Sequence, residues 1–315
     1  MVKMIELITW LSILIAGILL MVFASDKAVE HSIFCATLFG MSQFMIGFML
    51  VSLGTDLPEI VNSIVSCSLG HADVDVGDSI GSVLAQLTLV LGILAIYSKP
   101  FKVKRKQVIV VGTCLFSSLV ALAVVVSIGF SRTTATLLVL SWLVYIFITR
   151  KVAKKWFGKD DYPIMPPRGW MHHLMAAALG FIGVAIGAYA VVQSVINLSV
   201  ALQIPEFLIS FFVVGIGTSL PELAVDLIAI RKNAFEVAIG DIIGSCVVDA
   251  SLSISIGQVL FPQPISVQLA EMMLIYTLIA SIIVVSILVL HEKADRKVGI
   301  IFIAVYLFSY LWVAL

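Results

Sequence analysis

The chain has 315 residues, of which 61% are hydrophobic and only 12% are charged, and its 19 basic side chains balance 19 acidic ones. Soluble domains carry roughly 25% charged residues, whereas the mean hydropathy of this chain is +1.15. These values exclude a water-soluble domain and predict an integral membrane protein.

Ten hydrophobic runs, each long enough to cross the roughly 30 Å of a bilayer's hydrocarbon core, follow one another along the chain. They lie at about residues 5–24, 32–69, 77–97, 107–129, 133–149, 171–198, 204–230, 238–261, 268–290 and 298–315. We interpret the first run as a span and not as a signal peptide, because it lacks a small-residue cleavage site. The predicted fold class is therefore an all-α integral membrane protein with ten transmembrane helices.

The longest polar connection, residues 150–168, contains Lys-Lys, Asp-Asp and Pro-Pro pairs and is typical of a linker. It divides the chain into a first five-helix repeat at residues 1–149, a cytoplasmic linker at 150–170 and a second five-helix repeat at 171–315. Because five spans precede the linker, the second half enters the membrane with the opposite polarity. This arrangement is an inverted-topology repeat.

The basic residues are strongly segregated in this plan. Seventeen of the 19 lie in connections on one side: Lys27, five residues within 99–106, six within 150–168, Arg231 and Lys232, and three within 293–297. Only Lys3 and Arg132 lie on the other side. The positive-inside rule makes the first side cytoplasmic, so we expect a multi-pass protein of the plasma membrane with both termini extracellular.

One polar motif occurs in both halves. Gly54-Thr55-Asp56-Leu57-Pro58-Glu59 returns as Gly217-Thr218-Ser219-Leu220-Pro221-Glu222, and Gly77-Asp78-Ser79-Ile80-Gly81-Ser82 returns as Gly240-Asp241-Ile242-Ile243-Gly244-Ser245. All of these positions are offset by 163 residues. Carboxylates and helix breakers at corresponding places of two apolar halves are typical of secondary transporters, with the ion-binding motifs here at 54–86 and 217–249.

Within each copy the polar residues recur every four positions, which places them on one helix face. The four resulting stripes are Thr55, Glu59, Ser63; Asp78, Ser82, Gln86; Thr218, Glu222, Asp226; and Asp241, Ser245, Asp249. Carboxylates together with hydroxyl and amide oxygens are the ligands that hard cations prefer. No Lys or Arg occurs in any stripe, so a bound cation or proton has to neutralise the acids.

Simpler interpretations exist for some of these residues. Asp56 and Ser219, each three residues before a glutamate, also match a capping box that restarts a helix. The glycines spaced by four also suit close helix packing. Cys35, Cys67, Cys114 and Cys246 lie in apolar stretches and are expected to pack as small residues, since their spacing fits neither disulfides nor a metal site. We expect Asp73, Asp75 and His71, in or near a turn, to be solvated.

At these motifs the sequence resembles the calcium/cation antiporter superfamily, specifically its prokaryotic sodium/calcium exchanger branch. The resemblance covers both motifs and the ten-span plan. It implies that Glu59, Glu222, Thr55 and Thr218 coordinate calcium and that Ser82, Ser219 and Ser245 help to hold sodium. It further implies that Gln86 and Asp249 complete the site, and that the first and sixth spans slide against the core to alternate access.

The chain departs from the family pattern by carrying more acid. Asp56 stands where the family usually has Ser, Asp78 and Asp241 stand where it has Asn, and Gln86 stands where it has Asn or Asp. Asp226 replaces an ordinarily neutral residue. Crowded carboxylates repel one another when ionised and so favour proton binding, which leaves Na+ and H+ both open as the coupling ion.

The sequence therefore predicts a secondary antiporter, not an enzyme, that exchanges calcium or a similar divalent cation for sodium by alternating access. A proton-driven divalent exchanger is the alternative, and a cation channel or a membrane scaffold are further classes. We expect no cofactor, no nucleic acid and no obligate protein partner, only inorganic cations and lipid. The predicted ion-site residues are Thr55, Asp56, Glu59, Ser82, Gln86, Thr218, Ser219, Glu222, Ser245 and Asp249.

Overall fold

The computed structural model describes residues 2–38, 52–157, 170–231 and 235–313, and nearly all of them are helical. The first half contains α1 (Val2–Leu38), α3 (Ser52–Thr55), α4 (Leu57–Ser68), α5 (Ala72–Leu84), η2 (Ala85–Val90), α6 (Leu91–Tyr97), β1 (Phe101–Lys102), α7 (Arg105–Ile128) and α8 (Arg132–Phe157). The second half contains α9 (Trp170–Leu202), α10 (Glu206–Ile209), η3 (Ser210–Val214), α11 (Gly215–Thr218), α12 (Leu220–Arg231), α13 (Phe235–Val248), η4 (Asp249–Ser253), α14 (Ile254–Leu260), α15 (Val267–His291), β2 (Lys293–Ala294) and α16 (Arg296–Val313). The segments η2, η3 and η4 are π-helical turns inside longer helices.

Eight helical segments in the described part of the chain are long and apolar enough to cross a membrane: Met4–Ala28, Ala72–Tyr97, Arg105–Ile128, Met171–Leu202, Glu206–Arg231, Ala238–Leu260, Val267–His291 and Arg296–Val313. A shorter apolar helix covers Arg132–Ile148. The all-helical membrane class is therefore confirmed. The second predicted run includes residues 39–51, and the predicted linker includes 158–169. Both segments lie outside the described residues, so the ten-span count stays a prediction.

The elements repeat with the same spacing as the motifs. Adding 163 to the bounds of α3, α4 and α6 gives the bounds of α11, α12 and α14. The same shift brings α5 onto α13 and η2 onto η4, with a difference of one residue at a boundary. The two halves thus share their helix breaks as well as their motifs.

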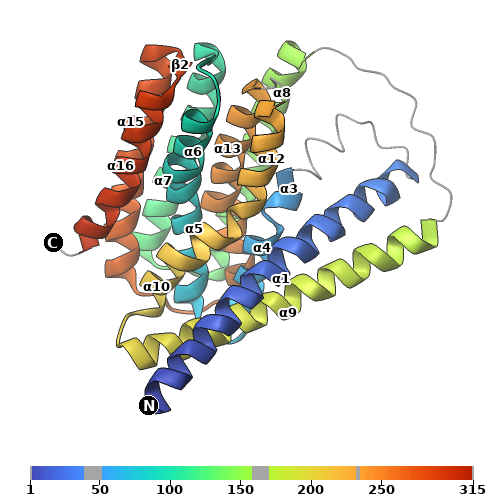
Figure 1. Cartoon of the computed structure of the whole chain (residues 1–315), viewed down its shortest axis with the longest axis vertical. Coiled ribbons are helices and arrows are strands. Elements are labelled where there is room, and N and C mark those ends of the chain that lie inside the picture. The colour runs from blue at the N-terminus through green and yellow to red at the C-terminus, as the bar shows by residue number, and fades with distance from the viewer. Residues whose placement is uncertain (1, 39–51, 158–169, 232–234, 314–315) are drawn as a thin grey trace.

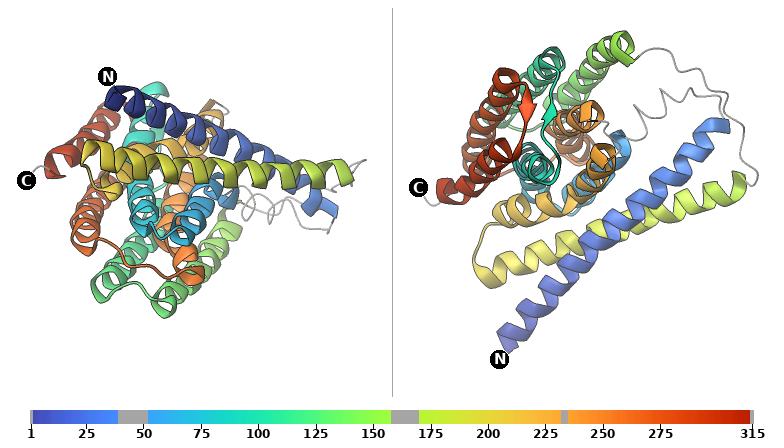
Figure 2. Two further views of the ribbon diagram at one scale, coloured as in Figure 1. Left: turned by 90° about the horizontal axis from the view of Figure 1, so that it is seen from below. Right: turned by 45° about the horizontal axis from the view of Figure 1, so that its top comes forward.

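Helices α1 and α9 form a long pair that crosses the remaining helices obliquely (Figure 1) and covers one side of them (Figure 2). Small residues lie where the two helices meet. A Cβ atom built on Gly187 would lie 2.9 Å from the carbonyl oxygen of Gly17 and 2.6 Å from Cγ of Met21. Glycine at this crossing lets the two backbones approach within a distance that a side chain would prevent.

The two ends of the helix assembly can be distinguished by their connections. At one end, β1 pairs with β2 in a two-stranded antiparallel ribbon that joins the α6–α7 and α15–α16 connections. We call this the ribbon end. The α5–η2–α6 helix runs from there to His71, whose Nδ1 atom lies 2.9 Å from Oε2 of Glu206 on α10. We call this opposite end the His71 end.

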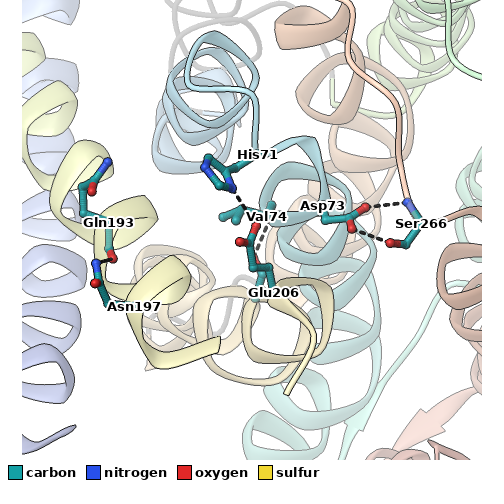
Figure 3. Close-up of polar contacts among 8 residues, drawn as sticks. His71, Asp73, Val74, Gln193, Asn197, Glu206 and Ser266 are labelled. Carbon is teal, nitrogen blue, oxygen red and sulfur yellow. Dashed lines mark hydrogen bonds and ion pairs between the residues drawn. The ribbon is translucent and has the colours of Figure 1, made fainter. Parts of the chain in front are cut away.

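Further polar contacts join elements at the His71 end (Figure 3). The backbone N–H of Ser266 donates to Oδ1 of Asp73 at 2.6 Å, and its hydroxyl donates to Oδ2 at 2.5 Å. The Ser210 hydroxyl donates to the carbonyl oxygen of Val74 at 2.5 Å. The expectation that His71 and Asp73 are simply solvated is wrong, because both side chains are half-buried and tie the start of α5 to its neighbours.

The two halves are not packed equally. Towards the His71 end, α4 packs closely against α9 and α14. The corresponding helix of the second half, α12, makes far fewer contacts with α1 and α6, which are the counterparts of α9 and α14. Sequence-related elements therefore occupy two different arrangements in one molecule.

Candidate ion-binding site

Both copies of the motif break a helix at the same place and in the same way. Asp56 separates α3 from α4 with φ −79° and ψ 5°, and Ser219 separates α11 from α12 with φ −80° and ψ 5°. A proline follows two residues later in each copy, where the missing N–H is tolerated in the first helical turn. The Asp56 side chain makes no capping hydrogen bond, and the Ser219 hydroxyl donates back to Gly215 O at 2.7 Å. The capping-box interpretation is therefore not supported at either position.

The two glutamates of the motifs lie deep in the protein. Glu59 is 1% exposed and Glu222 is 0% exposed. None of their four carboxylate oxygens has a hydrogen-bond partner among the described residues. Each glutamate is repelled by Asp56 and Asp249, and Glu59 also by Glu222 itself. We call Glu59, Glu222 and Asp249 the central acids.

Asp78 lies beside the central acids in a hydrogen-bonded group contributed by both halves. Asn62 Nδ2 donates to Asp78 Oδ2 at 2.6 Å, and Thr218 Oγ1 donates to Asp78 Oδ1 at 2.9 Å. The Ser82 and Thr218 hydroxyls are 3.2 Å apart. Ser82 also lies 3.3 Å from the carbonyl oxygen of Gly215. Hydroxyl, carbonyl and carboxylate oxygens thus converge here, which is a ligand set suited to a hard cation.

Gln86 and Asp249 meet between the halves at equivalent positions of the two π-helical turns. Gln86 Nε2 donates to Asp249 Oδ2 at 3.1 Å, while Asp249 Oδ1 has no partner in the described structure. The residue numbers differ by 163, which is the repeat offset. Cys246 Sγ lies 3.7 Å from the Val83 carbonyl oxygen, and this pair has the same offset. At both places, equivalent residues of the two halves contact each other directly.

A second acidic group, which includes Asp56 and Asp241, also lies near the central acid Glu222. Asp56 and Asp226 are fully buried, Asp241 is half-buried, and Asp241 repels each of the other two. The Ser245 hydroxyl faces Asp56. Asp241 and Ser245 are the counterparts of Asp78 and Ser82 in the first half. This second group contains two further acids, Asp56 and Asp226. No basic side chain of the described chain forms an ion pair with any of the acids in the two groups.

All ten predicted ion-site residues are buried, with exposed fractions between 0% and 7%. Nine of them take part in the contacts and repulsions described above, and the tenth, Thr55, ends α3 directly before Asp56. Sequence reasoning missed Asn62, which carries no signature by itself, and it placed Asp75 wrongly: this residue lies in α5 and is 1% exposed. In the part of the chain that is described, no three His, Cys, Asp or Glu side chains converge as a preformed metal centre. A cation here therefore needs hydroxyl and carbonyl ligands in addition to carboxylates.

The glycines of the two motif copies differ in how closely a neighbouring helix approaches them. A Cβ atom on Gly81 would collide with the carbonyl oxygen of Phe211, and one on Gly77 with that of Phe207. The predicted packing role is therefore confirmed for these two glycines. A Cβ atom on Gly240 would meet only Gln107 Nε2 at 3.4 Å, and one on Gly244 meets no described atom within 4 Å.

The fold and the buried acids define the class of protein: a multi-pass membrane protein whose two related halves enclose unneutralised carboxylates in apolar surroundings. The sodium/calcium exchanger protein family matches residues 9–151 and 172–315. This match covers most of the chain, so the chain belongs to that family of membrane antiporters. The resemblance inferred from the two motifs is confirmed.

Individual relatives match over nearly the whole length. An uncharacterized membrane protein of Methanocaldococcus jannaschii is 30% identical over 294 residues, which cover 93% of this chain and 94% of the relative. The sodium/calcium exchanger MaX1 of Methanosarcina acetivorans is 26% identical over 308 residues, covering 84% and 86% of the two chains. A solved structure of the sodium-calcium exchanger NCX_Mj, soaked with Na+ and Sr2+, aligns with a TM-score of 0.64 and 28% identity over 97% of this chain and 98% of that one.

Proposed function

We propose that this protein is a secondary active antiporter that exchanges Ca2+, or a divalent cation of similar chemistry, for Na+ across the plasma membrane. The observation that carries the proposal is the burial of Glu59 and Glu222 at equivalent positions of the two halves, where none of their four carboxylate oxygens has a hydrogen-bond partner among the described residues. Two mutually repelling carboxylates balance the charge of one divalent cation. The relatives named as sodium/calcium exchangers support the choice of ions.

In this proposal the chain forms ten transmembrane helices in two inverted five-helix repeats. The α6–α7 connection lies at the ribbon end, where β1 pairs with β2. Its counterpart 163 residues later is the α14–α15 connection, and Ser266 in that connection bonds to Asp73 at the His71 end. Equivalent connections at opposite ends of the molecule support an inverted relation between the halves.

The orientation follows from the basic residues. The ribbon end carries the basic segments 99–106 and 293–297, which β1 and β2 bring together. Arg132 lies near the other end, where it donates hydrogen bonds to the carbonyl oxygens of Val259 and Leu260 at 3.0 and 3.3 Å. By the positive-inside rule the ribbon end is cytoplasmic, and the His71 end and both termini are extracellular.

Exchange results from competition for the same carboxylates. Glu59 and Glu222 coordinate the divalent cation with Thr55 and Thr218, and Ser82, Ser219 and Ser245 join Asp56, Gln86 and Asp249 in holding the monovalent ions. Occupation by one kind of ion excludes the other. Bound ions that stabilise one arrangement of the halves over the other then shift the population between inward-open and outward-open states, with α1 and α9 moving against the remaining helices.

A proton-driven divalent exchanger is the second candidate, because this chain buries acids beyond the two glutamates. Asp56 and Asp226 are each repelled by Asp241. Such a group is most stable when protons or cations reduce its charge. Replacing Asp56 by Ser, the residue at the equivalent position 219, removes one acid without changing the site elsewhere.

The deciding experiment is Ca2+ uptake into proteoliposomes that contain the purified protein, driven by an outward Na+ gradient or, in a parallel arm, by an outward proton gradient. Uptake driven by Na+ and lost in Glu222→Gln supports the proposal. Uptake driven only by protons selects the second candidate, and Asp56→Ser is then expected to weaken the dependence on pH. If neither gradient moves Ca2+, the substrate assignment is wrong.

A matched control distinguishes loss of a ligand from loss of any glutamate. Glu271 accepts a hydrogen bond from Ser127 at 2.7 Å between α7 and α15, at an exposed position, and it belongs to neither acidic group of the site. Glu271→Gln is therefore expected to retain uptake. An equal loss of uptake in Glu271→Gln and Glu222→Gln would remove the support for a carboxylate site.

A further inference from the structure

Asp75 is a buried acid that the proposed exchange site does not use. It lies in the first turn of α5, towards the His71 end, and is 1% exposed. Its Oδ2 atom lies 3.5 Å from Cys67 Sγ, whereas its Oδ1 atom has no hydrogen-bond partner among the described residues. A buried carboxylate oxygen without a donor is costly unless an ion or a proton neutralises it.

The surroundings of Asp75 consist of neutral oxygen-bearing groups. The hydroxyls of Ser63 on α4 and Ser79 on α5 lie near its carboxylate, and the Ser63 hydroxyl also accepts a hydrogen bond from the Gly257 N–H at 3.0 Å. The amide oxygen of Asn62, next to Ser63 in the chain, has no hydrogen-bond partner among the described residues, and neither has the Ser79 hydroxyl. These side chains are 0–1% exposed. Asp75 Oδ1, the Asn62 amide oxygen and the Ser79 hydroxyl are therefore three buried oxygens of neighbouring residues that lack a partner among the described residues.

An acid in the first helical turn also interacts favourably with the helix dipole. Asp73 occupies the same turn, is half-buried, and has both carboxylate oxygens bonded to Ser266. Asp75 differs because it is completely buried and keeps one oxygen unpaired. Stabilisation of the helix terminus requires neither property, so the dipole does not account for this site.

We infer that Asp75, Ser63 and Ser79 form an outer binding site for one monovalent cation of the Na+ type. The oxygen ligands suit a hard cation. A single carboxylate balances one positive charge, whereas a divalent cation would leave an uncompensated charge in a medium of low dielectric constant. The site is separate from the ten residues assigned to exchange and does not depend on Ca2+ being the substrate.

The outer site belongs to one half only. The residues 163 positions after Ser63, Asp75 and Ser79 are Asp226, Ala238 and Ile242, which do not reproduce the combination. On its inner side the site adjoins Asn62, which donates to Asp78 and so leads to the central acids. A cation bound here lies between the His71 end and the exchange site and increases the local supply of ions from that end alone.

The test is equilibrium binding of radioactive sodium to the purified full-length protein in Ca2+-free buffer, with wild type, Asp75→Asn, Asp75→Glu and the exposed-acid control Asp26→Asn. We expect Asp75→Asn to lose one bound Na+ per chain, or to bind one Na+ with about tenfold or more weaker affinity. Asp75→Glu keeps the charge and is expected to retain one bound Na+ per chain with a changed affinity, whereas an unchanged affinity would speak against a ligand role. Asp26→Asn is expected to equal wild type.

Wild-type Na+ stoichiometry in Asp75→Asn overturns the inference, and a change in pH dependence alone assigns a proton to Asp75 instead of a cation. If Asp75→Asn does not fold, the comparison of Asp75→Glu with wild type decides, because a longer acid in the same site shifts the Na+ affinity only if it is a ligand. Ca2+ uptake by wild type is measured in parallel. Loss of Na+ binding in Asp75→Asn together with no Ca2+ uptake by wild type would support the outer site while refuting the proposed exchange.

Discussion

Replacement of Glu222 by Gln tests the central acids most directly, because it removes a charge and preserves the shape of the side chain. Glu222 is 0% exposed, and both of its carboxylate oxygens lack a partner in the described structure. Without a cation, its ionised form adds to the repulsion from Asp56 and Asp249. The variant is therefore expected to fold at least as stably as wild type in ion-free buffer and to lose stabilisation by Ca2+.

The size of that loss can be worked out from the charge that is removed. Removing one partner of a buried ion pair costs about 3–5 kcal/mol, and each 1.4 kcal/mol corresponds to about tenfold in Kd. We therefore expect the Kd for Ca2+ to rise by about 100-fold or more. At a Ca2+ concentration of about 100 times the wild-type Kd, binding stabilises wild type by about 2.7 kcal/mol but the variant by only about 0.4 kcal/mol.

The assay is thermal unfolding of purified wild type, Glu222→Gln and the control Glu271→Gln in detergent, over a Ca2+ titration at constant ionic strength. Wild type and the control should gain stability together as Ca2+ increases, whereas the Glu222→Gln curve should stay nearly flat. A Ca2+-dependent gain in Glu222→Gln equal to that of wild type would refute the reasoning that this carboxylate carries the divalent ion.

Two further predictions use residues that are equivalent in the two halves. Gly81→Ala is expected to lower both the thermal stability and the Ca2+ uptake, because its Cβ atom would collide with Phe211 O. Gly244→Ala should change both much less, because no described atom lies within 4 Å of its Cβ position. Equal losses in the two variants would contradict the packing argument. The double variant Gln86→Asp with Asp249→Gln keeps one amide and one acid at the contact between the halves. It should therefore retain more Na+-driven uptake than Gln86→Asp or Asp249→Gln alone. Additive losses of uptake would argue against a shared contact.

The repeated elements could be predicted from the sequence because hydrophobic runs and the 163-residue offset are both local patterns. The same applies to the polar stripes: a spacing of four residues placed Glu59, Asp78, Glu222 and Asp249 in the buried interior, and the structure buries all four. The π-helical turns that carry Gln86 and Asp249 could not be predicted, since no local propensity distinguishes them from α-helix.

The error at Asp75 has a different cause. A residue four positions after the turn at His71 is ordinarily solvated, but the packing of α4, α5 and α14 encloses this one. Gly257 on α14 packs so closely on α4 that a Cβ atom there would collide with the carbonyl oxygen of Ser63. Burial created by a contact across nearly 200 residues leaves no trace in the local sequence, so neither Asp75 nor Asn62 could be recognised from it.

The unequal packing of equivalent helices connects the repeat to the proposed transport cycle. If α4 and α12 packed equally against their neighbours, both ends of the molecule would be closed to the same degree. A bound ion would then have no preferred side of the membrane to which it is released. Here α4 packs against α9 and α14, while α12 is much less engaged with their counterparts α1 and α6. Val65 on α4 joins the hydrophobic cluster beneath α1 and α9, and its counterpart Ile228 is 52% exposed. In the proposed exchange, the state that opens to the other side would have these two arrangements interchanged, with the His71 end loosened and the ribbon end closed. Related sequence in two unequal arrangements is what the proposed alternating-access exchange requires of the two halves.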